Sequence, residues 1–386
     1  MNRKTSREPE VRLPIKLEPV SNGEFVPRPE DPRLAVVRRV AHEQAGENAR
    51  RLGLSRRQFL ESTCGAATVL LAMNHVLGCR GAGYDLPTES ALDADAARAS
   101  LSGDELVFDV QTHHVSPSRP WRERNVGMAT FLANAPGAGC GRPDWIDCYA
   151  RDAYLKEVFL ESDTDVAVLS ALWGGREANP IHVEEMAETR SRVAKLAGTP
   201  RLRIHGIVHP NDGPMEAVRD RMAAAADEWK IAAWKLYPLW GPEGKGFFLD
   251  DPDYGVPTIE HGLRLALPLF AVHKGLPLPG QDPKFAAARD VGRVARLFPQ
   301  ATFLIYHSGH DSNHIEGPYD PTAEKGVDAL IAGLEENGIG QDGNVYAELG
   351  TTWRDVMRNP DQAGHLIGKL LVHLGPERIL WGTDSI

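Results

Sequence analysis

The sequence feature that most constrains this chain is the stretch LVFDVQTHH, from Leu106 to His114. Its apolar start predicts a buried strand, and polar residues follow at alternate positions. Because side chains along a strand alternate between its two faces, Asp109, Gln111 and His113 are expected to share one face. A buried strand that ends in several polar groups on one face predicts the floor of an active site.

Apolar segments of strand length alternate with helical patterns through the rest of the chain. The predicted strands lie at 106–109, 165–169, 203–208, 231–236, 268–272, 301–306, 344–347 and 379–381. Predicted helices fill the gaps at 148–160, 181–197, 214–228, 256–265, 284–298, 322–337 and 361–374. Eight short strands separated by helices indicate a (β/α)8 TIM barrel of the α/β class. An open doubly wound sheet is the alternative, but no GxGxxG turn follows the first strand to support it.

The predicted barrel lacks its last helix. The eighth strand ends at Trp381, and the sequence ends at Ile386. A closed barrel without that helix would leave apolar wall exposed. We therefore expect the barrel domain at 105–386 to be truncated at its C-terminus.

Composition excludes few classes of protein. The chain is 42% hydrophobic and 25% charged, as globular proteins are. Its net charge of −10 gives no support for nucleic-acid binding. Four cysteines are too few for a disulfide scaffold, although the spacing of Cys140 and Cys148 permits a small loop in an oxidising compartment.

The first hundred residues differ from the rest. Residues 1–54 are polar and contain prolines without a sustained apolar period, which predicts a disordered or poorly packed segment. The next residues, Ser55 to Leu60, read SRRQFL and precede a moderately apolar run at 63–78. Two arginines before such a run resemble a twin-arginine export signal, with an amphipathic helix packed on the domain as the alternative.

This resemblance implies a partner and a location. It implies that the twin-arginine export machinery carries the folded chain to the periplasm. Residues 76–79, which read VLGC, weakly resemble a lipoprotein cleavage box and would place a lipid anchor on Cys79. We therefore divide the chain into a polar N-terminal region with the signal segment at 1–83, a linker at 84–104 and the barrel domain at 105–386.

Polar residues follow most of the predicted strands. The active site of a (β/α)8 barrel lies at the C-terminal ends of its strands. The candidates there are Asp109, Gln111, His113, His209, Lys235, His273, His307, Glu348 and Asp384. Histidine and carboxylate side chains from different strands can converge on one divalent metal, and a catalytic zinc takes about three such ligands and a water.

Five motifs in this order resemble the amidohydrolase superfamily. They are DVQTH at 109–113, AAWKLYP at 232–238, FAVH at 270–273, LIYHSGH at 304–310 and WGTD at 381–384. The resemblance covers 105–386 and is to the amidohydrolase-related branch that includes the aminocarboxymuconate-semialdehyde decarboxylase group. It implies one divalent metal, expected to be zinc, held by His113, His273 and Asp384. His307 is then either a fourth ligand or, as the resemblance implies, the group that orients or deprotonates the water. Asp384 either binds the metal or, as the resemblance also implies, moves a proton.

One position departs from this pattern. The family has a histidine where this chain has Gln111, and an amide is a poor ligand for zinc. The departure argues against a two-metal site and leaves a single metal. Lys235 is either a substrate-carboxylate contact, a charge partner for Glu348 or a carboxylated metal bridge.

Substrate contacts are expected from Gln111, Lys235, Glu348 and Trp121. The last of these lies in a long insertion at 116–147 that we predict to be a lid over the pocket, with surface decoration as the alternative. His310 and His314 follow the sixth strand and either line the pocket or stay in solvent.

Three functions remain open from the sequence. The first is a metal-dependent hydrolase that acts on a carboxylic ester, lactone or amide of a small molecule. The second is a non-oxidative decarboxylase on the same scaffold, and the third is a catalytically silent binding protein in which Gln111 marks a lost metal site. The chain is also compatible with a homo-oligomer.

Overall fold

The computed structural model describes residues 12–17, 31–78, 83–101, 105–278 and 280–386. Its contacts divide the chain into two compact units, Met1–Glu105 and Leu106–Ile386.

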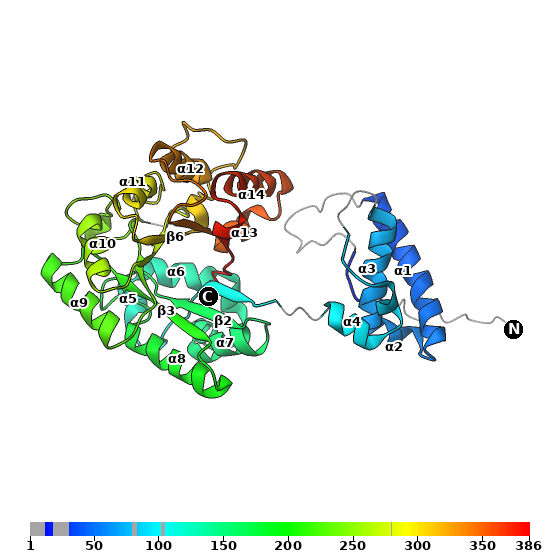
Figure 1. The fold of residues 1–386 in the computed structure, drawn as a ribbon. Helices are drawn as coiled ribbons and strands as arrows, with labels where there is room; N and C mark the ends of the chain where they lie inside the picture. The colour runs from blue at the N-terminus through cyan, green and yellow to red at the C-terminus, as the bar shows by residue number, and fades with distance from the viewer. Residues whose placement is uncertain (1–11, 18–30, 79–82, 102–104, 279) are drawn as a thin grey trace. The chain divides into compact units, whose positions relative to one another are not determined.

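Eight parallel strands form one sheet in the second unit, in the order of the chain. They are β1 (Phe108–Thr112), β2 (Val166–Ser170), β3 (Leu202–Val208), β4 (Ala233–Leu236), β5 (Leu269–His273), β6 (Thr302–Tyr306), β7 (Val345–Glu348) and β8 (Ile379–Leu380). The segment that follows β8 returns to β1: the amide of Val110 donates to the carbonyl of Trp381 at 3.3 Å, and the amide of Asp384 donates to the carbonyl of Gln111 at 2.9 Å. These hydrogen bonds close the sheet, and the predicted (β/α)8 barrel is confirmed (Figure 1).

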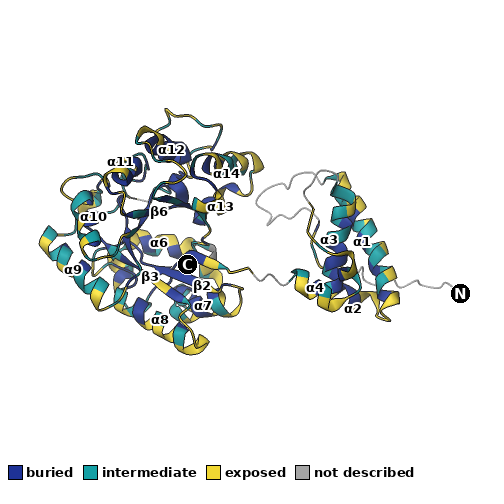
Figure 2. Cartoon of the chain, viewed as in Figure 1, coloured by how far each residue is buried: buried dark blue, intermediate teal, exposed yellow. Residues whose placement is uncertain are grey.

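Helices surround the barrel, both on its outside and at the C-terminal ends of its strands (Figure 1). They are α5 (Trp121–Arg124), α6 (Val126–Asn134), α7 (Arg151–Leu155), α8 (Val183–Ala197), α9 (Met215–Asp227), α10 (Gly255–Arg264), α11 (Asp290–Leu297), α12 (Gly326–Glu336), α13 (Gly350–Val356) and α14 (Pro360–Leu374). The buried residues gather on the strands and on the helix faces that turn toward them (Figure 2). The main core therefore lies between the sheet and its helices, as expected for strands with two buried faces.

The first strand begins later than predicted. Leu106 is 73% exposed and Phe108 is 41% exposed, so the apolar start of LVFDVQTHH is not buried. From Asp109 onward the strand is buried, and its alternation holds. His114 turns outward, where its Nε2 atom lies 2.9 Å from the hydroxyl of Thr189 on α8, while Gln111 turns inward.

Residues 381–386 follow β8 without a helix, and Trp381 is 44% exposed. The predicted truncation of the barrel stays a prediction.

The described part of the first unit is helical. It contains α1 (Pro32–Arg51), α2 (Arg56–Leu60), α3 (Thr63–Leu77) and α4 (Ala94–Leu101). The predicted disorder of residues 1–54 is therefore wrong for α1, and the segment predicted as a linker at 84–104 contains α4. Small side chains at every fourth position of α1 explain the difference, because they pack against apolar residues of α2 and α3. These α1 residues are Val37, Ala41, Ala45 and Ala49.

The SRRQFL motif has a structural role in this unit. Ser55 caps α2 and forms a capping box with Gln58. Phe59 and Leu60 are buried, whereas both arginines are exposed. Over the described residues, no helix combines the length and the apolar character that crossing a membrane requires.

Candidate active site

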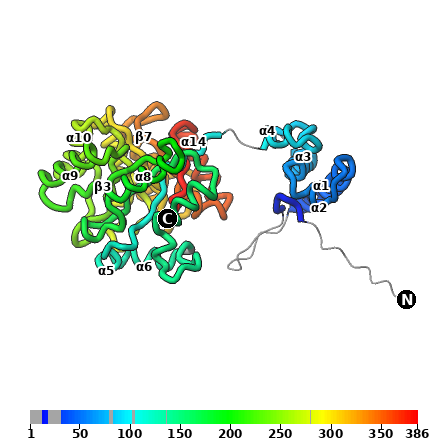
Figure 3. Tube along the Cα trace, turned by 90° about the horizontal axis from the view of Figure 1, so that it is seen from below, coloured from blue at the N-terminus to red at the C-terminus, as the bar shows by residue number. Residues whose placement is uncertain are grey.

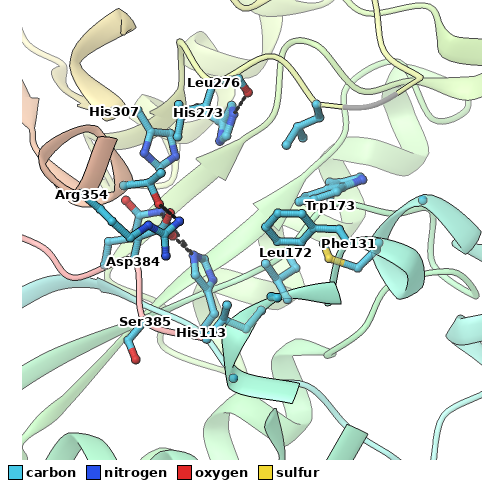
Figure 4. A pocket seen from close by; sticks show the side chains of 18 of the residues that line it. His113, Phe131, Leu172, Trp173, His273, Leu276, His307, Arg354, Asp384 and Ser385 are labelled. Carbon is cyan, nitrogen blue, oxygen red and sulfur yellow. Dashed lines mark hydrogen bonds and ion pairs between the residues drawn. The ribbon is translucent and has the colours of Figure 1, made fainter. Parts of the chain in front are cut away.

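A cavity of about 1180 Å³ opens at the C-terminal ends of the strands. The structure places five residues predicted from the sequence on its polar side: Gln111, His113, His273, His307 and Asp384. Apolar side chains form the facing wall, among them Phe131 of α6 and Trp173 after β2 (Figure 4). Five side chains from β1, β5, β6 and the end of β8 thus share one pocket with an apolar wall.

His113 and Asp384 meet at the centre of the polar side. The Nε2 atom of His113 lies 3.1 Å from Oδ1 of Asp384. The Nδ1 atom of His113 lies 2.7 Å from the carbonyl oxygen of Ser170, so Nδ1 is the nitrogen that donates. In a neutral ring the lone pair of Nε2 then faces a carboxylate oxygen. Two facing lone pairs at this distance require a proton or another cation between them.

The side chain of Gln111 lies against this pair. Its Nε2 atom donates to Oδ1 of Asp384 at 2.6 Å and lies 3.3 Å from Nε2 of His113. Its Oε1 atom is buried and has no hydrogen-bond partner. Turning the amide over would bring that oxygen toward His113 instead. Gln111 can therefore serve the site as a hydrogen-bond donor or as a neutral oxygen ligand.

Asp384 is held by its neighbours. The hydroxyl of Thr351 donates to Oδ2 of Asp384 at 2.5 Å. The carboxylate of Asp109 fixes the preceding residue, accepting from the amide of Thr383 at 2.9 Å and from its hydroxyl at 2.6 Å. Burial alone would raise the pKa of Asp384, but the contact with His113 and the nearby imidazole of His307 outweigh it and lower that pKa below its usual value. The carboxylate is therefore ionised at neutral pH.

His273 and His307 lie edge to face, with 4.6 Å between their ring centroids. Burial lowers the pKa of His307 to about 3 and that of His273 well below its usual value, so both rings are neutral at pH 7. The Nε2 atom of His273 lies 3.2 Å from the carbonyl oxygen of Leu276, while Nδ1 of His307 is buried without a partner. His307 also has a φ of 67°, and backbone strain of this kind is concentrated at functional sites.

The chemistry of these groups fits a divalent metal. Zinc bonds of about 2.1 Å place two tetrahedral ligand atoms about 3.4 Å apart, and the 3.1 Å between His113 and Asp384 is close to that spacing. The third proposed ligand, His273, does not lie close enough to the other two. Within the described residues, His113, His273 and Asp384 do not bring three ligand atoms within 4.8 Å of one another. Nε2 of His273 would have to turn from the Leu276 carbonyl to complete the set.

A different cluster does bring such atoms together. One ligand atom each from His314, Glu316 and Asp328 lie within 4.8 Å of one another. The ammonium group of Lys369 already lies there, 2.6 Å from Glu316 and 2.9 Å from Asp328. Because this ammonium supplies the positive charge that the carboxylates require, we interpret the cluster as structural. His310 joins it at 2.9 Å from Glu316, so neither His310 nor His314 lines the cavity.

Three predicted substrate contacts are corrected. Lys235, Glu348 and Trp121 are fully buried, and none of them lines the cavity. The Nζ atom of Lys235 lies 3.5 Å from the ring centroid of Tyr306, and Glu348 accepts a hydrogen bond from the amide of His307 at 3.0 Å. Lys235 and Glu348 therefore lie beneath the strand ends, whereas Trp121 packs within the insertion. Strand alternation placed Lys235 at the right strand end but could not show how deep it lies.

His209, at the end of β3, lies outside the cavity as well. Its ring stacks on Trp240 with 3.9 Å between centroids, and it lines a separate cavity of about 330 Å³.

The insertion at 116–147 covers part of the cavity. Figure 3 shows α5 and α6 at the side of the barrel where the C-terminus lies, and α6 contributes Val126, Met128 and Phe131 to the lining. A disulfide between Cys140 and Cys148 ties the end of this insertion. The structure thus supports the lid interpretation over surface decoration.

Replacing both Cys140 and Cys148 by serine is expected to loosen the lid and leave the barrel folded. Closing so short a loop stabilises the folded state by about 2.5 kcal/mol through the unfolded chain. We expect faster protease cleavage within residues 126–147, measured by mass spectrometry of timed digests. Adding a reducing agent to the wild-type chain should reproduce the pattern, and an unchanged pattern would count against a tethered lid.

Several cavity residues were missed from the sequence, among them two polar residues of one helix. Thr351 and Arg354 lie on α13, and both line the cavity. The guanidinium of Arg354 donates to the hydroxyl of Thr351 at 3.1 Å. The segment GTTWR carries no motif and no clear helical period, so no sequence signal pointed to it.

Comparisons with known proteins give limited similarities. No family model matches the chain. The chain is 35% identical over 129 residues to the catalase-peroxidase of two strains of Leptospira biflexa serovar Patoc, a match that covers 31% of this chain and 16% of that enzyme. The chain thus spans about a sixth of the length of the curated relatives it matches.

Several solved structures resemble it distantly. One is 2,6-dihydroxybenzoate decarboxylase complexed with 2,6-dihydroxybenzoate, with 14% identity, a TM-score of 0.41 and coverage of 72% of this chain and 88% of the other. Another is 4-oxalomesaconate hydratase from Rhodopseudomonas palustris, with 16% identity, a TM-score of 0.43 and coverage of 73% and 82%. A third is a dihydroxybenzoic acid decarboxylase from Polaromonas sp. JS666 with bound manganese, with 14% identity, a TM-score of 0.40 and coverage of 72% and 86%. The fold assignment rests on this chain's own strand pairing.

Proposed function

We propose that this chain is a metal-dependent hydrolase that acts on a small molecule in the strand-end cavity. The observation that carries the proposal is the facing pair of His113 Nε2 and Asp384 Oδ1 at 3.1 Å, which requires a proton or a metal cation between the two atoms. Neutral imidazoles of His273 and His307 lie on the same cavity. Zinc is the proposed metal, because imidazole and carboxylate donors are those of a catalytic zinc site.

The proposed catalytic role of each residue follows from its protonation state and its hydrogen bonds. When bound, the metal supplies a Lewis acid that polarises a carbonyl group and lowers the pKa of water. The unpartnered Nδ1 of His307 would accept a proton from the attacking water, and the ionised Asp384 would take up that proton before it passes to the leaving group. The lid limits access of bulk water. We propose hydrolysis of a carboxylic ester, lactone or amide.

The test combines metal content with product analysis. Elemental analysis should find about one metal per purified chain, and less in His113→Ala and His273→Ala. His365→Ala, which removes an exposed histidine, should retain it. A panel of esters, lactones and amides would be assayed for hydrolysis, and aromatic acids for carbon dioxide. Metal-dependent hydrolysis supports the proposal. Carbon dioxide without hydrolysis would replace it by decarboxylation, and neither metal nor turnover would leave a binding protein.

Restoring a histidine at position 111 should strengthen metal retention. Gln111 already lies against two of the three proposed ligands, His113 and Asp384, so the imidazole of Gln111→His would add a fourth donor. We expect about tenfold slower loss of metal to a chelator, the scale on which changes around a metal site act. Gln111→Leu, which offers no donor, is the control. Equal retention in all three proteins would contradict the ligand assignment.

We also propose that the chain is exported to the periplasm by the twin-arginine route. The exposed arginines of SRRQFL support this, as does the disulfide between Cys140 and Cys148, since disulfides persist in oxidising compartments. The proposed lipid anchor at Cys79 lies outside the described residues.

Changing Arg56 and Arg57 together to lysine is expected to block this export. The change keeps both charges and removes the planar guanidinium groups that a specific receptor can distinguish. Cell fractionation of the full chain would measure the periplasmic share. Arg50→Lys with Arg51→Lys, at the end of α1, is the matched control. Equal export of all three proteins would refute the proposed route.

A further inference from the structure

Arg354 is the one arginine or lysine among the described residues that line the strand-end cavity. Its hydrogen bond to Thr351 is the one polar contact of its guanidinium within the described part of the chain. Figure 4 shows Arg354 beside Asp384, on the side of the cavity opposite Phe131 and Trp173. The cavity therefore combines a cation without a carboxylate partner and an apolar wall.

One hydrogen bond, to Thr351, links this exposed cation to the proposed reacting groups. Thr351 uses its hydroxyl proton to donate to Asp384 at 2.5 Å and accepts from Arg354 at 3.1 Å. One hydroxyl group thus separates the guanidinium from Asp384. The guanidinium keeps its other N–H donors for a ligand, and their planar arrangement matches the two oxygens of a carboxylate.

We propose that Arg354 is a specificity residue that binds a carboxylate group of the substrate. The substrate class is then an apolar or aromatic molecule that carries a carboxylate next to the bond that reacts. Phe131 and Trp173 contact the apolar body, and Arg354 orients the anionic end. This inference rests on the proposed function for the identity of the reacting bond, whereas the anion site itself stands on the cavity and on Arg354.

Binding of a matched pair of ligands tests the inference without turnover. Phenylacetate and phenylacetamide have the same shape and differ in charge. Calorimetry on the full chain would measure both, in the wild type and in Arg354→Gln, Arg354→Lys and Asp355→Asn. Asp355 lines the same cavity with the opposite charge and is the control.

We expect the wild type to bind phenylacetate about tenfold more tightly than phenylacetamide, the scale of one charge-assisted hydrogen bond. Arg354→Gln should lose this preference and Arg354→Lys should keep part of it. Asp355→Asn should keep or raise the preference, because it removes a negative charge from the same cavity. Because a bound metal also attracts carboxylates, the decisive quantity is the difference in preference between the wild type and Arg354→Gln. An equal preference in these two proteins would overturn the inference.

The same proteins separate this inference from the proposed function. Metal content and hydrolysis of the neutral ester phenyl acetate would be measured alongside binding. If hydrolysis depends on the metal but carboxylate preference does not depend on Arg354, the inference fails and the proposed function stands. If carboxylate preference depends on Arg354 but no metal or hydrolysis is found, the proposed function fails alone. A loss of metal in Arg354→Gln with unchanged preference would make Arg354 a support for Asp384 and would also overturn the inference.

Discussion

Asp384→Asn is expected to remove both the metal and the activity while the barrel stays folded. Oδ1 of Asp384 accepts from Gln111 at 2.6 Å and faces His113 at 3.1 Å, and Oδ2 accepts from Thr351 at 2.5 Å. Asparagine keeps the shape of the side chain and loses its negative charge. We expect metal affinity to fall by more than about 100-fold, beyond the loss of an outer hydrogen-bond partner, and hydrolysis by about 10³-fold.

Asp355→Asn is the matched control for this variant. It makes the same chemical change at another carboxylate of the same cavity, which lies 3.9 Å from Nε2 of His310. Elemental analysis, steady-state rates and circular dichroism would be compared across the two variants and the wild type. If Asp384→Asn retained its metal, the facing pair would be held by a proton, and the hydrolase proposal would lose its main support.

Glu316→Gln is expected to cause a large loss of stability. The carboxylate is buried, receives the ammonium of Lys369 at 2.6 Å and lies 2.9 Å from Nδ1 of His310. Removing one member of a buried ion pair costs about 3–5 kcal/mol. Lys369 keeps Asp328 as a partner at 2.9 Å, so we expect the lower end, about 3 kcal/mol, from urea unfolding at pH 7.

The stability difference between the wild type and Glu316→Gln should become smaller as the pH falls. Burial acts to raise the pKa of Glu316, but hydrogen bonds with His310 and Lys369 outweigh it and lower the pKa from 4.5 to about 2. A carboxyl with a lowered folded-state pKa stabilises the fold fully above its unfolded pKa and loses that contribution as the pH falls toward the folded value. The stability gap between the wild type and Glu316→Gln should therefore shrink as the pH is lowered from about 4.5 to about 2.

An exposed pair provides the control for this prediction. Glu188 lies 3.0 Å from Arg151 and its side chain is 67% exposed. Glu188→Gln should change the free energy of unfolding by less than about 1 kcal/mol, because solvent screens such pairs. A gap that stayed constant over the same pH range would show that Glu316 acts through packing.

The strands and the residues at their ends show which features could be predicted from the sequence. Apolar segments predicted all eight strands, because the strands of a parallel sheet covered by helices are largely buried on both faces and are therefore rich in apolar residues. Alternation along β1 placed Gln111 and His113 on the inner face and His114 on the outer face. It did not place the start of the strand, where Leu106 is exposed at the end of the barrel. The local sequence pattern predicts the face of the strand to which a side chain points, but not how deeply that side chain is buried.

The sequence by itself determined the barrel and the strand ends from which His113, His273, His307 and Asp384 reach one cavity. The tertiary structure decided which strand-end groups are accessible: it buried Lys235 and Glu348 beneath the floor and brought Arg354 and Thr351 to the wall. It also decided that α1, predicted as disordered, packs on α3. The physical reason is the same in each case. Burial depends on which distant segments pack together, and the periodicity of one segment does not contain that information.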